Sequence, residues 1–391
     1  MSSYTSIHAQ TFGSDNWCLS LQPLYSHALL TSLSNGEVHH LDWVTGKSKA
    51  VDQAGTSSIN KLKIINADFQ GGSQYAVASN DSINVFDIRS RDRLARLKNE
   101  KNAPFLSLDS RHNLLACGTE LTGVDAEVHI YDIRNWKTPV RSFMDSHHDD
   151  VTDIRFHPSD SKLLLSGSTD GYTNVYDLTQ QDEEDALHQV INYASIHSCG
   201  WLAPRRIYTL SHMETLAIHE LNDKSDESRE PQPNDFGDVR DKWGCNYVVD
   251  IYPGYIAVGG SQQDAGFLKI VPFDNEKSDL NRALTITSAH GDDIVRDVLV
   301  PPQNPDILYS CGEDGTVKTW KISNSTYHPR SEFWNYSIKM DLFSSEENHK
   351  EPPLTKETFE HPSSQSGEQQ ENKRTREKSK KHKKSHRYKP Y

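Results

Sequence analysis

The sequence predicts an all-β protein, a seven-bladed β-propeller followed by a charged C-terminal tail. Two observations predict this fold. A strand pattern recurs about every 45 residues along the first 320 or so positions, and most of its units contain a short apolar run followed by a tight turn. A period of about 40–45 residues is typical of the four-stranded sheets that form the blades of a propeller.

The recurring pattern is an alternation of apolar residues that ends in an aromatic or large apolar residue followed by an acidic one. Four acidic residues occupy the last position at regular steps of 45 residues: Asp42, Asp87, Asp132 and Asp177. Three later positions continue the series at steps of 43, 52 and 49 residues: Glu220, Pro272 and Lys321. The series therefore indicates seven repeat units.

The turn is clearest in the stretch LLLSGSTDGYTNVYDL, Leu163–Leu178, where Asp170 and Gly171 separate two apolar runs. Asp-Gly and Asn-Gly tolerate the positive φ angles that a two-residue hairpin requires. Counterparts at the same phase are Asn35-Gly36, Asn80-Asp81, Asp314-Gly315 and, more weakly, Asp125 and Asp264. The apolar runs before these turns, such as KLLLSG, are too short for helices and predict buried strands.

The composition agrees with a small hydrophobic core that is divided among many short strands. Hydrophobic residues make up 35% of the chain, the mean hydropathy is -0.73 and the net charge is -13. The negative charge argues against attraction of the whole protein to nucleic acid. Five cysteines without CxxC spacing argue against a disulfide framework or a structural zinc site. With neither a signal peptide nor a long apolar segment, we expect a soluble protein of a reducing compartment, without a membrane.

Two blades carry further motifs that resemble the WD-repeat β-propeller family. The stretch Ser146–Leu178 contains a leading His, Ser-Gly-Ser, Asp-Gly and Tyr-Asp, and Ala289–Ile322 contains Ala-His, Arg-Asp, Asp-Gly and Trp-Lys. In this family a His, a strand Ser or Thr, the turn Asp and a Trp form a hydrogen-bonded network within one blade. The resemblance implies two such networks: His147 (or His148), Ser166, Asp170 and Tyr176, and His290, Ser310, Asp314 and Trp320.

The resemblance also implies how the ring closes and suggests a subgroup. An N-terminal strand at Ser6–Phe12 would supply the outer strand of the blade that ends at Ile322. Seven irregular blades, the stretch Phe236–Ile251 and a basic tail look like the WD repeat-containing protein 89 group, from which no catalytic residues transfer. The expected domains are a propeller at 1–342, with an acidic loop insertion at 221–242, and a disordered tail at 343–391 that is basic from 373. A second acidic loop is expected at Thr179–His188.

The basic tail is a candidate nuclear localisation signal. Its Lys/Arg cluster comprises Lys373, Arg374, Arg376, Lys378, Lys380, Lys381, Lys383 and Lys384. Residues 371–391 hold ten Lys/Arg and two Glu, a net charge of +8, so residues 1–370 carry about -21. Clustered Lys/Arg fit the acidic grooves of a nuclear import carrier and also RNA phosphates. A merely solubilising terminus is the alternative.

Acidic pairs precede two inner strands and are candidates for a partner-binding rim. Asp149 and Asp150 with Arg155, and Asp292 and Asp293 with Arg296, follow the leading His of their blades. Such a rim could attract a basic partner by electrostatic steering, or it could simply be solvated. A catalytic carboxylate pair would need a cleft and one raised pKa, which the sequence does not indicate.

No motif predicts a catalytic, cofactor or metal site. The sequence lacks GxSxG, a Walker A loop, GxGxxG and HExxH. The Gly-rich stretch Gly254–Gly266 precedes a strand, so we interpret it as a turn, and Cys117 and Cys311 fall on apolar strands as expected of core thiols. The aromatic segment Ser331–Phe343 either docks on the propeller or binds a partner.

We therefore expect a non-enzymatic nuclear interaction scaffold, a monomer within a complex, that binds a protein partner across its loop rim. The nucleolus and the cytoplasm are the alternative locations. A sharper version is an escort or assembly factor for a basic protein, such as a ribosomal protein or histone, in ribosome biogenesis or chromatin; the tail could instead contact RNA. A propeller hydrolase is the third class and has the least support.

Overall fold

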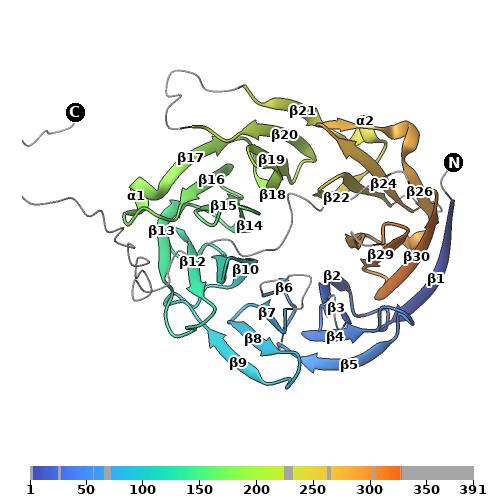
Figure 1. Cartoon of the computed structure of the whole chain (residues 1–391), viewed down its shortest axis with the longest axis horizontal. Helices are drawn as coiled ribbons and strands as arrows, with labels where there is room; N and C mark the ends of the chain where they lie inside the picture. Colours follow the sequence, from blue (N-terminus) through green and yellow to red (C-terminus); the bar gives the residue numbers. More distant parts are fainter. Residues whose placement is uncertain are drawn as a thin grey trace, which may run out of the picture. The chain divides into compact units, whose positions relative to one another are not determined.

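Seven antiparallel sheets stand side by side around an axis in the computed structural model, which describes residues 3–24, 28–55, 57–65, 72–223, 232–261, 266–301, 304–325 and 327. Figure 1 shows the ring viewed along this axis, with the first strand of each blade innermost. The seven-bladed propeller predicted from the repeat is therefore confirmed.

Blades one to four follow the chain order. Blade one is β2 (Cys18–Leu24), β3 (Ala28–Leu33), β4 (Glu37–Leu41) and β5 (Ser48–Gln53). Blade two is β6 (Lys61–Ile64), β7 (Gln74–Ala78), β8 (Ile83–Asp87) and β9 (Arg93–Leu97). Blade three is β10 (Phe105–Arg111), β11 (Leu114–Thr119), β12 (Ala126–Asp132) and β13 (Arg141–His147). Blade four is β14 (Val151–Phe156), β15 (Leu163–Ser168), β16 (Tyr172–Asp177) and β17 (Leu187–Asn192), with helix α1 (Glu183–Ala186) before its last strand.

Blades five to seven carry the additional elements. Blade five is β18 (Ile196–Ala203), β19 (Arg206–Ser211), β20 (Thr215–Glu220) and β21 (Asn234–Asp238), and helix α2 (Arg240–Trp243) follows it. Blade six is β22 (Tyr247–Tyr252), β23 (Tyr255–Gly260), β24 (Phe267–Asp274) and β26 (Leu284–Thr287), with β25 (Lys277–Ser278) and the 3-10 helix η1 (Leu280–Arg282). Blade seven is β28 (Val295–Leu299), β29 (Ile307–Gly312) and β30 (Thr316–Ser323), preceded by β27 (Ala289–Asp292).

The first strand of the chain completes the last blade. β1 (Ser3–Thr11) pairs antiparallel with β30, from Ser3 opposite Ser323 to Thr11 opposite Thr316. The predicted closing strand is confirmed, although it begins three residues earlier than the sequence indicated. The Tyr4 hydroxyl, 2.9 Å from Thr287 Oγ1, links this strand to blade six as well.

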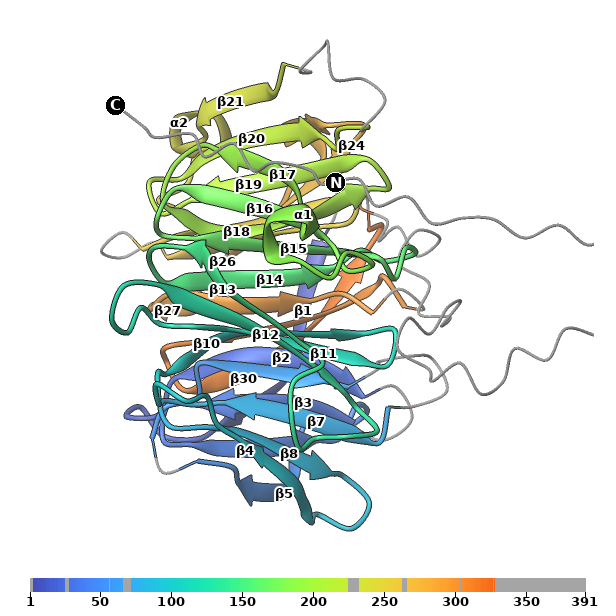
Figure 2. The ribbon, with the colours of Figure 1, turned by 90° about the vertical axis from the view of Figure 1, so that its left-hand side faces the viewer.

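The hydrophobic core consists of seven layers, one between each pair of neighbouring blades. Each buried cluster of the described residues combines side chains of exactly two adjacent blades, including blades seven and one. A blade in the ring is thus covered on both faces, which explains why strands such as β15 and β12 are apolar runs rather than alternating patterns. Figure 2 shows the same sheets from the side of the ring.

Polar groups of the inner strands bond from one blade to the next. Register shifts occur near the start of β2, β10, β14, β18, β22 and β28, and three of the donors, Ser107, Thr152 and Ser198, lie at these shifts. The donor and acceptor pairs are Asn60 Nδ2 to Phe105 O (2.9 Å), Ser107 Oγ to Val151 O (2.8 Å), Thr152 Oγ1 to Ile196 O (2.7 Å), Ser198 Oγ to Asp250 Oδ1 (2.7 Å) and Tyr252 OH to Asp297 Oδ1 (2.9 Å).

Asp297 completes this series between the last blade and the first. Its carboxylate accepts the Leu21 N–H at 2.8 Å, the Val298 N–H at 2.7 Å and the Tyr252 hydroxyl. Burial raises the pKa of Asp297, and the hydrogen bonds from Leu21 and Tyr252 oppose that shift. One carboxylate therefore joins blades six, seven and one.

Two expected loops are corrected by the structure. The second part of the 221–242 insertion is not a loop, because Asn234–Asp238 forms the outer strand of blade five and α2 follows directly. The Trp243 side chain is almost fully buried between blades five and six, which anchors α2. The expected loop at Thr179–His188 contains α1, and Glu183 accepts backbone N–H groups of Met144 and Asp145. The expected tail, 343–391, lies outside the described residues.

We predict that Asp297→Ala lowers the free energy of unfolding by about 2 kcal/mol, because the Leu21 N–H and the Tyr252 hydroxyl lose their acceptor. The exposed Asp293 is the matched control, and Asp293→Ala should change stability by less than about 0.5 kcal/mol. Urea unfolding followed by tryptophan fluorescence measures both. Equal losses for the two variants would contradict a closing role for Asp297.

Candidate functional site

The face that carries the predicted acidic pairs is formed by two kinds of loop. In antiparallel blades, the loops that lead from one blade to the next lie at the same end as the turns between second and third strands. We call these loops and turns the loop rim. The corners between first and second strands, and between third and fourth strands, form the opposite face.

Acidic side chains dominate the loop rim. Its described carboxylates are Asp15, Asp81, Glu100, Glu120, Asp125, Asp149, Asp150, Asp170, Glu214, Asp241, Asp292, Asp293, Glu313 and Asp314. The Lys and Arg residues of the same described stretches are Lys98, Lys101, Arg240 and Lys242. The loop rim therefore has a large excess of negative charge, which favours contact with a basic surface.

In blade seven, four side chains form a continuous hydrogen-bonded chain. Trp320 Nε1 donates to Ser310 Oγ at 2.9 Å, and Ser310 Oγ lies 2.7 Å from His290 Nε2. His290 Nδ1 lies 2.8 Å from Asp314 Oδ1. Because the Ser310 oxygen accepts from Trp320, its hydroxyl can donate to Nε2, which leaves Nδ1–H to donate to Asp314.

This network lowers the pKa of the Asp314 carboxyl group. Burial alone would raise the pKa of Asp314, but the hydrogen bond from His290, with contributions from Thr316 and Lys318, lowers it to about 2. Asp314 is thereby held ionised, and it also accepts the Thr316 N–H at 3.0 Å within the turn. The network thus fixes a turn of the loop rim to the blade core.

In blade four, the structure brings together the corresponding residues with a looser fourth member. His147 lies 2.7 Å from Ser166 Oγ through Nε2 and 2.9 Å from Asp170 Oδ2 through Nδ1. Tyr176, in the position of Trp320, is 3.4 Å from Ser166 Oγ and stacks on Phe143. His148, the alternative, instead points outward and pairs with Asp125 at 2.6 Å.

The predicted rim carboxylates differ in their surroundings. Asp292 and Asp293 are exposed. Asp150 Oδ1 accepts the Leu121 N–H at 2.8 Å, and Asp149 Oδ1 accepts the Asp150 N–H at 2.9 Å, so these two also shape their own loops. The pair at Asp292 and Asp293 is consequently the part of the loop rim that most plainly faces solvent.

The two predicted rim arginines lie on inner strands rather than in loops. Arg155 is in β14, and its guanidinium pairs with Asp153 at 3.1 Å and with Asp250 of blade six at 3.5 Å, so it reaches past blade five and joins blades four and six. Arg296 is in β28, where it pairs with Glu313 and lies over the Trp17 ring, 5.5 Å from its centroid. Arg296 thus borders the loop rim, whereas Arg155 belongs to the interior.

Sequence reasoning missed the exposed apolar residues of the loop rim. Trp17 is 44% exposed, Met213 64% and Val124 78%. Large apolar and aromatic side chains that are surrounded by polar groups are typical anchors of protein interfaces. Because Trp17 comes directly before the inner strand of blade one, its place in the repeat is a signal that could have identified it.

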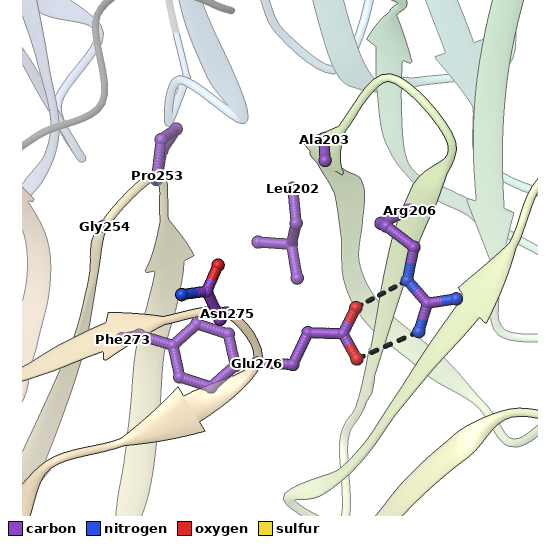
Figure 3. Close-up of a pocket in the computed structure, with 8 residues that line it drawn as sticks. All are labelled: Leu202, Ala203, Arg206, Pro253, Gly254, Phe273, Asn275 and Glu276. Atoms are coloured by element: carbon purple, nitrogen blue, oxygen red, sulfur yellow. Dashed lines mark hydrogen bonds and ion pairs between the residues drawn. The ribbon is translucent and has the colours of Figure 1, made fainter.

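Sequence reasoning also missed a pocket on the opposite face, between blades five and six. Its volume is about 300 Å³, and its lining is Leu202, Ala203, Arg206, Pro253, Gly254, Phe273, Asn275 and Glu276. Arg206 donates two hydrogen bonds to Glu276, at 2.5 and 2.9 Å, along one wall (Figure 3). The lining comes from three separate stretches, and the paired Arg206 and Glu276 lie 70 residues apart in the sequence, so no local pattern marks it.

The cysteines are packed in the structure. All five are free thiols, and Cys117 and Cys311 are fully buried on their strands, which confirms the core placement predicted for them. Burial raises the pKa of the less buried Cys245 to about 11, so its thiol is protonated at neutral pH. Within the described ranges, no group of three or more His, Cys, Asp or Glu is arranged to hold a metal ion, and no helix is suited to cross a membrane.

Comparison with known proteins gives a consistent result. The family model "WD domain, G-beta repeat" matches residues 137–177 and 281–321, which contain all residues of the two hydrogen-bonded networks. An uncharacterized WD repeat-containing protein of Saccharomyces cerevisiae is 57% identical over the full length of both chains. One of Schizosaccharomyces pombe is 32% identical over 62% of this chain and 78% of its own. The WD repeat-containing protein 89 homolog of Dictyostelium discoideum is 34% identical over 42% of this chain and 44% of its own.

We predict that Asp314→Asn makes the loss of stability in acid shallower. The lowered pKa of Asp314 means that its contribution is present above the unfolded-state value of 3.8 and is lost as the pH falls toward about 2. Burial also lowers the pKa of His219 to about 4, so other groups add to the wild-type slope, and the difference between the two proteins isolates Asp314.

The measurement is the urea midpoint at a series of pH values from about 5 to about 2.5, where the wild-type protein should lose up to about 1 kcal/mol per pH unit more than the variant. The exposed Asp292 of the same blade provides the control, since Asp292→Asn should keep the wild-type slope. Parallel slopes for Asp314→Asn and wild type would refute the role of this network.

Proposed function

Because the chain belongs to the WD-repeat family, we propose that it is a non-enzymatic interaction scaffold that binds a basic protein segment on its loop rim. The observation that supports this proposal is the excess of carboxylates on the described loops of that face. Loops held by a rigid frame are the usual place of binding residues, and here the frame is the closed ring.

The contacts within the loop rim support a preformed surface. The His147 and His290 networks hold two of its turns, and Asp150 holds the neighbouring loop through Leu121. A surface whose loops are already ordered loses less conformational entropy when it binds. Asp292 and Asp293 remain exposed next to one of these ordered turns, so a basic segment could contact them without rearrangement.

Apolar anchors favour a protein partner. Trp17 and Met213 are exposed among the acidic loops, and Trp17 already accepts a guanidinium, that of Arg296, over its ring. An indole face of this kind attracts Lys and Arg side chains, and aromatic anchors supply a large part of interface energy. A segment rich in Lys or Arg with some apolar residues would therefore fit this face better than one that is uniformly charged.

The sharper form of the proposal is an escort or assembly factor for a basic protein, such as a ribosomal protein or a histone. The charge of about -21 on residues 1–370 supports it, because a strongly acidic body accelerates encounter with a basic partner and screens its charge. Binding of this kind weakens steeply with salt, since the Debye length shortens from about 10 Å at 0.1 M to about 3 Å at 1 M.

Nuclear import is the part of the proposal that depends on the tail. The Lys/Arg cluster at Lys373–Lys384 lies outside the described residues, and its sequence alone supports recognition by an import carrier. The net charge of +8 on residues 371–391 also favours a contact with RNA phosphates as the second candidate.

We predict that the double variant Asp292→Lys, Asp293→Lys weakens binding of a fluorescent peptide made of alternating Lys and Arg by about tenfold or more. Raising the salt concentration should weaken binding of the same peptide to the wild-type protein by a similar factor. Fluorescence anisotropy gives the dissociation constants. Asp274→Lys, Asp306→Lys is the control, because both residues are exposed at corners of the opposite face and the total charge change is identical. If both double variants weaken binding equally, net charge rather than the loop rim attracts the peptide.

We predict that replacing Lys378, Lys380 and Lys381 by Ala shifts a fluorescent fusion of the full chain from nucleus to cytoplasm, because a carrier needs the clustered charges. The ratio of nuclear to cytoplasmic fluorescence in cells measures the shift. Replacing Lys350 and Lys356, which lie outside the cluster, by Ala provides a control that removes two charges rather than three. A nuclear ratio that is the same for all three proteins would contradict import through this cluster.

A further inference from the structure

The pocket between blades five and six offers an apolar surface without an uncompensated charge. Leu202, Ala203, Pro253 and Phe273 provide its apolar lining. Arg206 and Glu276 neutralise each other's charge through two hydrogen bonds, so the wall that they form does not require a charged ligand. A volume of about 300 Å³ suits one large side chain and its backbone.

The chain leaves the propeller on the same face as this pocket. β30 runs from the turn at Asp314 on the loop rim to Ser323 at the opposite face. Asn324 then adopts a left-handed conformation, with φ of 59°, which turns the chain. Tyr327 is 1% exposed and packs on Tyr255 of blade six, with ring centroids 5.7 Å apart. After its last strand, the chain has therefore turned from blade seven toward blade six.

The pocket begins beside the residues that Tyr327 contacts. Tyr255 stacks on Tyr252 with ring centroids 4.7 Å apart, and Pro253 and Gly254, which line the pocket, form the corner between these two tyrosines. Figure 3 shows this corner facing Leu202 and Ala203 of blade five. Trp334 comes seven positions after Tyr327, and an extended chain covers at most about 25 Å in seven steps. Trp334 is consequently within reach.

The sequence after Tyr327 contains one segment with an apolar face. From residue 334 to residue 342 the even-numbered positions are apolar and the odd-numbered positions polar: Trp334, Tyr336, Ile338, Met340 and Leu342 alternate with Asn335, Ser337, Lys339 and Asp341. In an extended strand, such a pattern places all five apolar side chains on one side. Beyond Phe343, Leu354 is the only Val, Ile, Leu, Met or Ala residue. This segment is therefore the part of the C-terminal sequence that needs a surface to cover it.

We propose that residues 331–343 bind in cis to the face opposite the loop rim, with the Trp334 side chain in the pocket between blades five and six. The apolar lining receives the indole, and the polar residues of the segment face solvent. This contact does not depend on the partner of the loop rim, and it keeps the beginning of the C-terminal sequence at the other face of the ring.

Amide hydrogen exchange of the full chain, measured by mass spectrometry, tests the contact. Peptides that cover 331–343 should exchange about tenfold or more slowly than an unstructured chain. Trp334→Ser, which removes the guest, and Ala203→Trp, which fills the pocket from its wall, should both abolish this protection, whereas Trp334→Phe should retain part of it. Val124→Ser is the control, because Val124 is 78% exposed on the loop rim, and it should leave the protection unchanged.

Three outcomes would overturn the proposal. Exchange of 331–343 at the unstructured rate in the wild-type chain would show that the segment is not docked, and the pocket would then be open to a separate partner. Protection that survives Ala203→Trp but not Trp334→Ser would place the tryptophan elsewhere. Loss of protection in the Val124→Ser control would show that the effect is not specific to the pocket.

Discussion

The carboxylate of Asp297 holds the position on which the ring depends. A propeller blade is stable only when both of its faces are covered, so an open ring would expose two apolar faces, one at each end of the series. Asp297 accepts the Leu21 N–H of the first blade and the Tyr252 hydroxyl of the sixth, while its own strand belongs to the seventh. The pairing of β1 with β30 closes the same junction at the periphery. Two sets of contacts therefore close the ring: hydrogen bonds of Asp297 near the axis and the pairing of β1 with β30 at the periphery.

A closed ring has two faces with different chemistry. The loop rim combines many carboxylates with a few exposed apolar side chains, and its turns in blades four and seven are tied to the blade core by the His147 and His290 networks. The opposite face holds a pocket with an apolar lining and an internally neutralised ion pair. A charged surface attracts partners from a distance, whereas an apolar pocket requires a ligand that is already close. Tyr327, the last described residue, packs on blade six, which also forms one wall of the pocket.

The two hydrogen-bonded networks also show how this propeller departs from a regular repeat. In blade seven, Trp320 donates to Ser310 at 2.9 Å, whereas in blade four Tyr176 lies 3.4 Å from Ser166 and stacks on Phe143 instead. The blades without such a network are held by the apolar layers and by bonds between inner strands, such as that from Ser198 to Asp250. Irregular blades remain possible because stability comes mainly from the interfaces between blades, which every blade shares.

The amino-acid pattern alone was sufficient to specify the seven blades and the hairpin turns, because each depends on residues that are close in sequence and recur at one period. The members of the two networks followed instead from the resemblance of two blades to WD repeats. It identified the acidic pairs at Asp149 and Asp292 but placed Arg155 beside them, although that side chain reaches past blade five to Asp250 of blade six. It also missed β21, whose pairing partner lies on the far side of a polar insertion, and the pocket. β21 depends on pairing across the insertion, whereas the pocket and the Arg155 contact depend on residues of different blades, and only the tertiary structure brings these groups together.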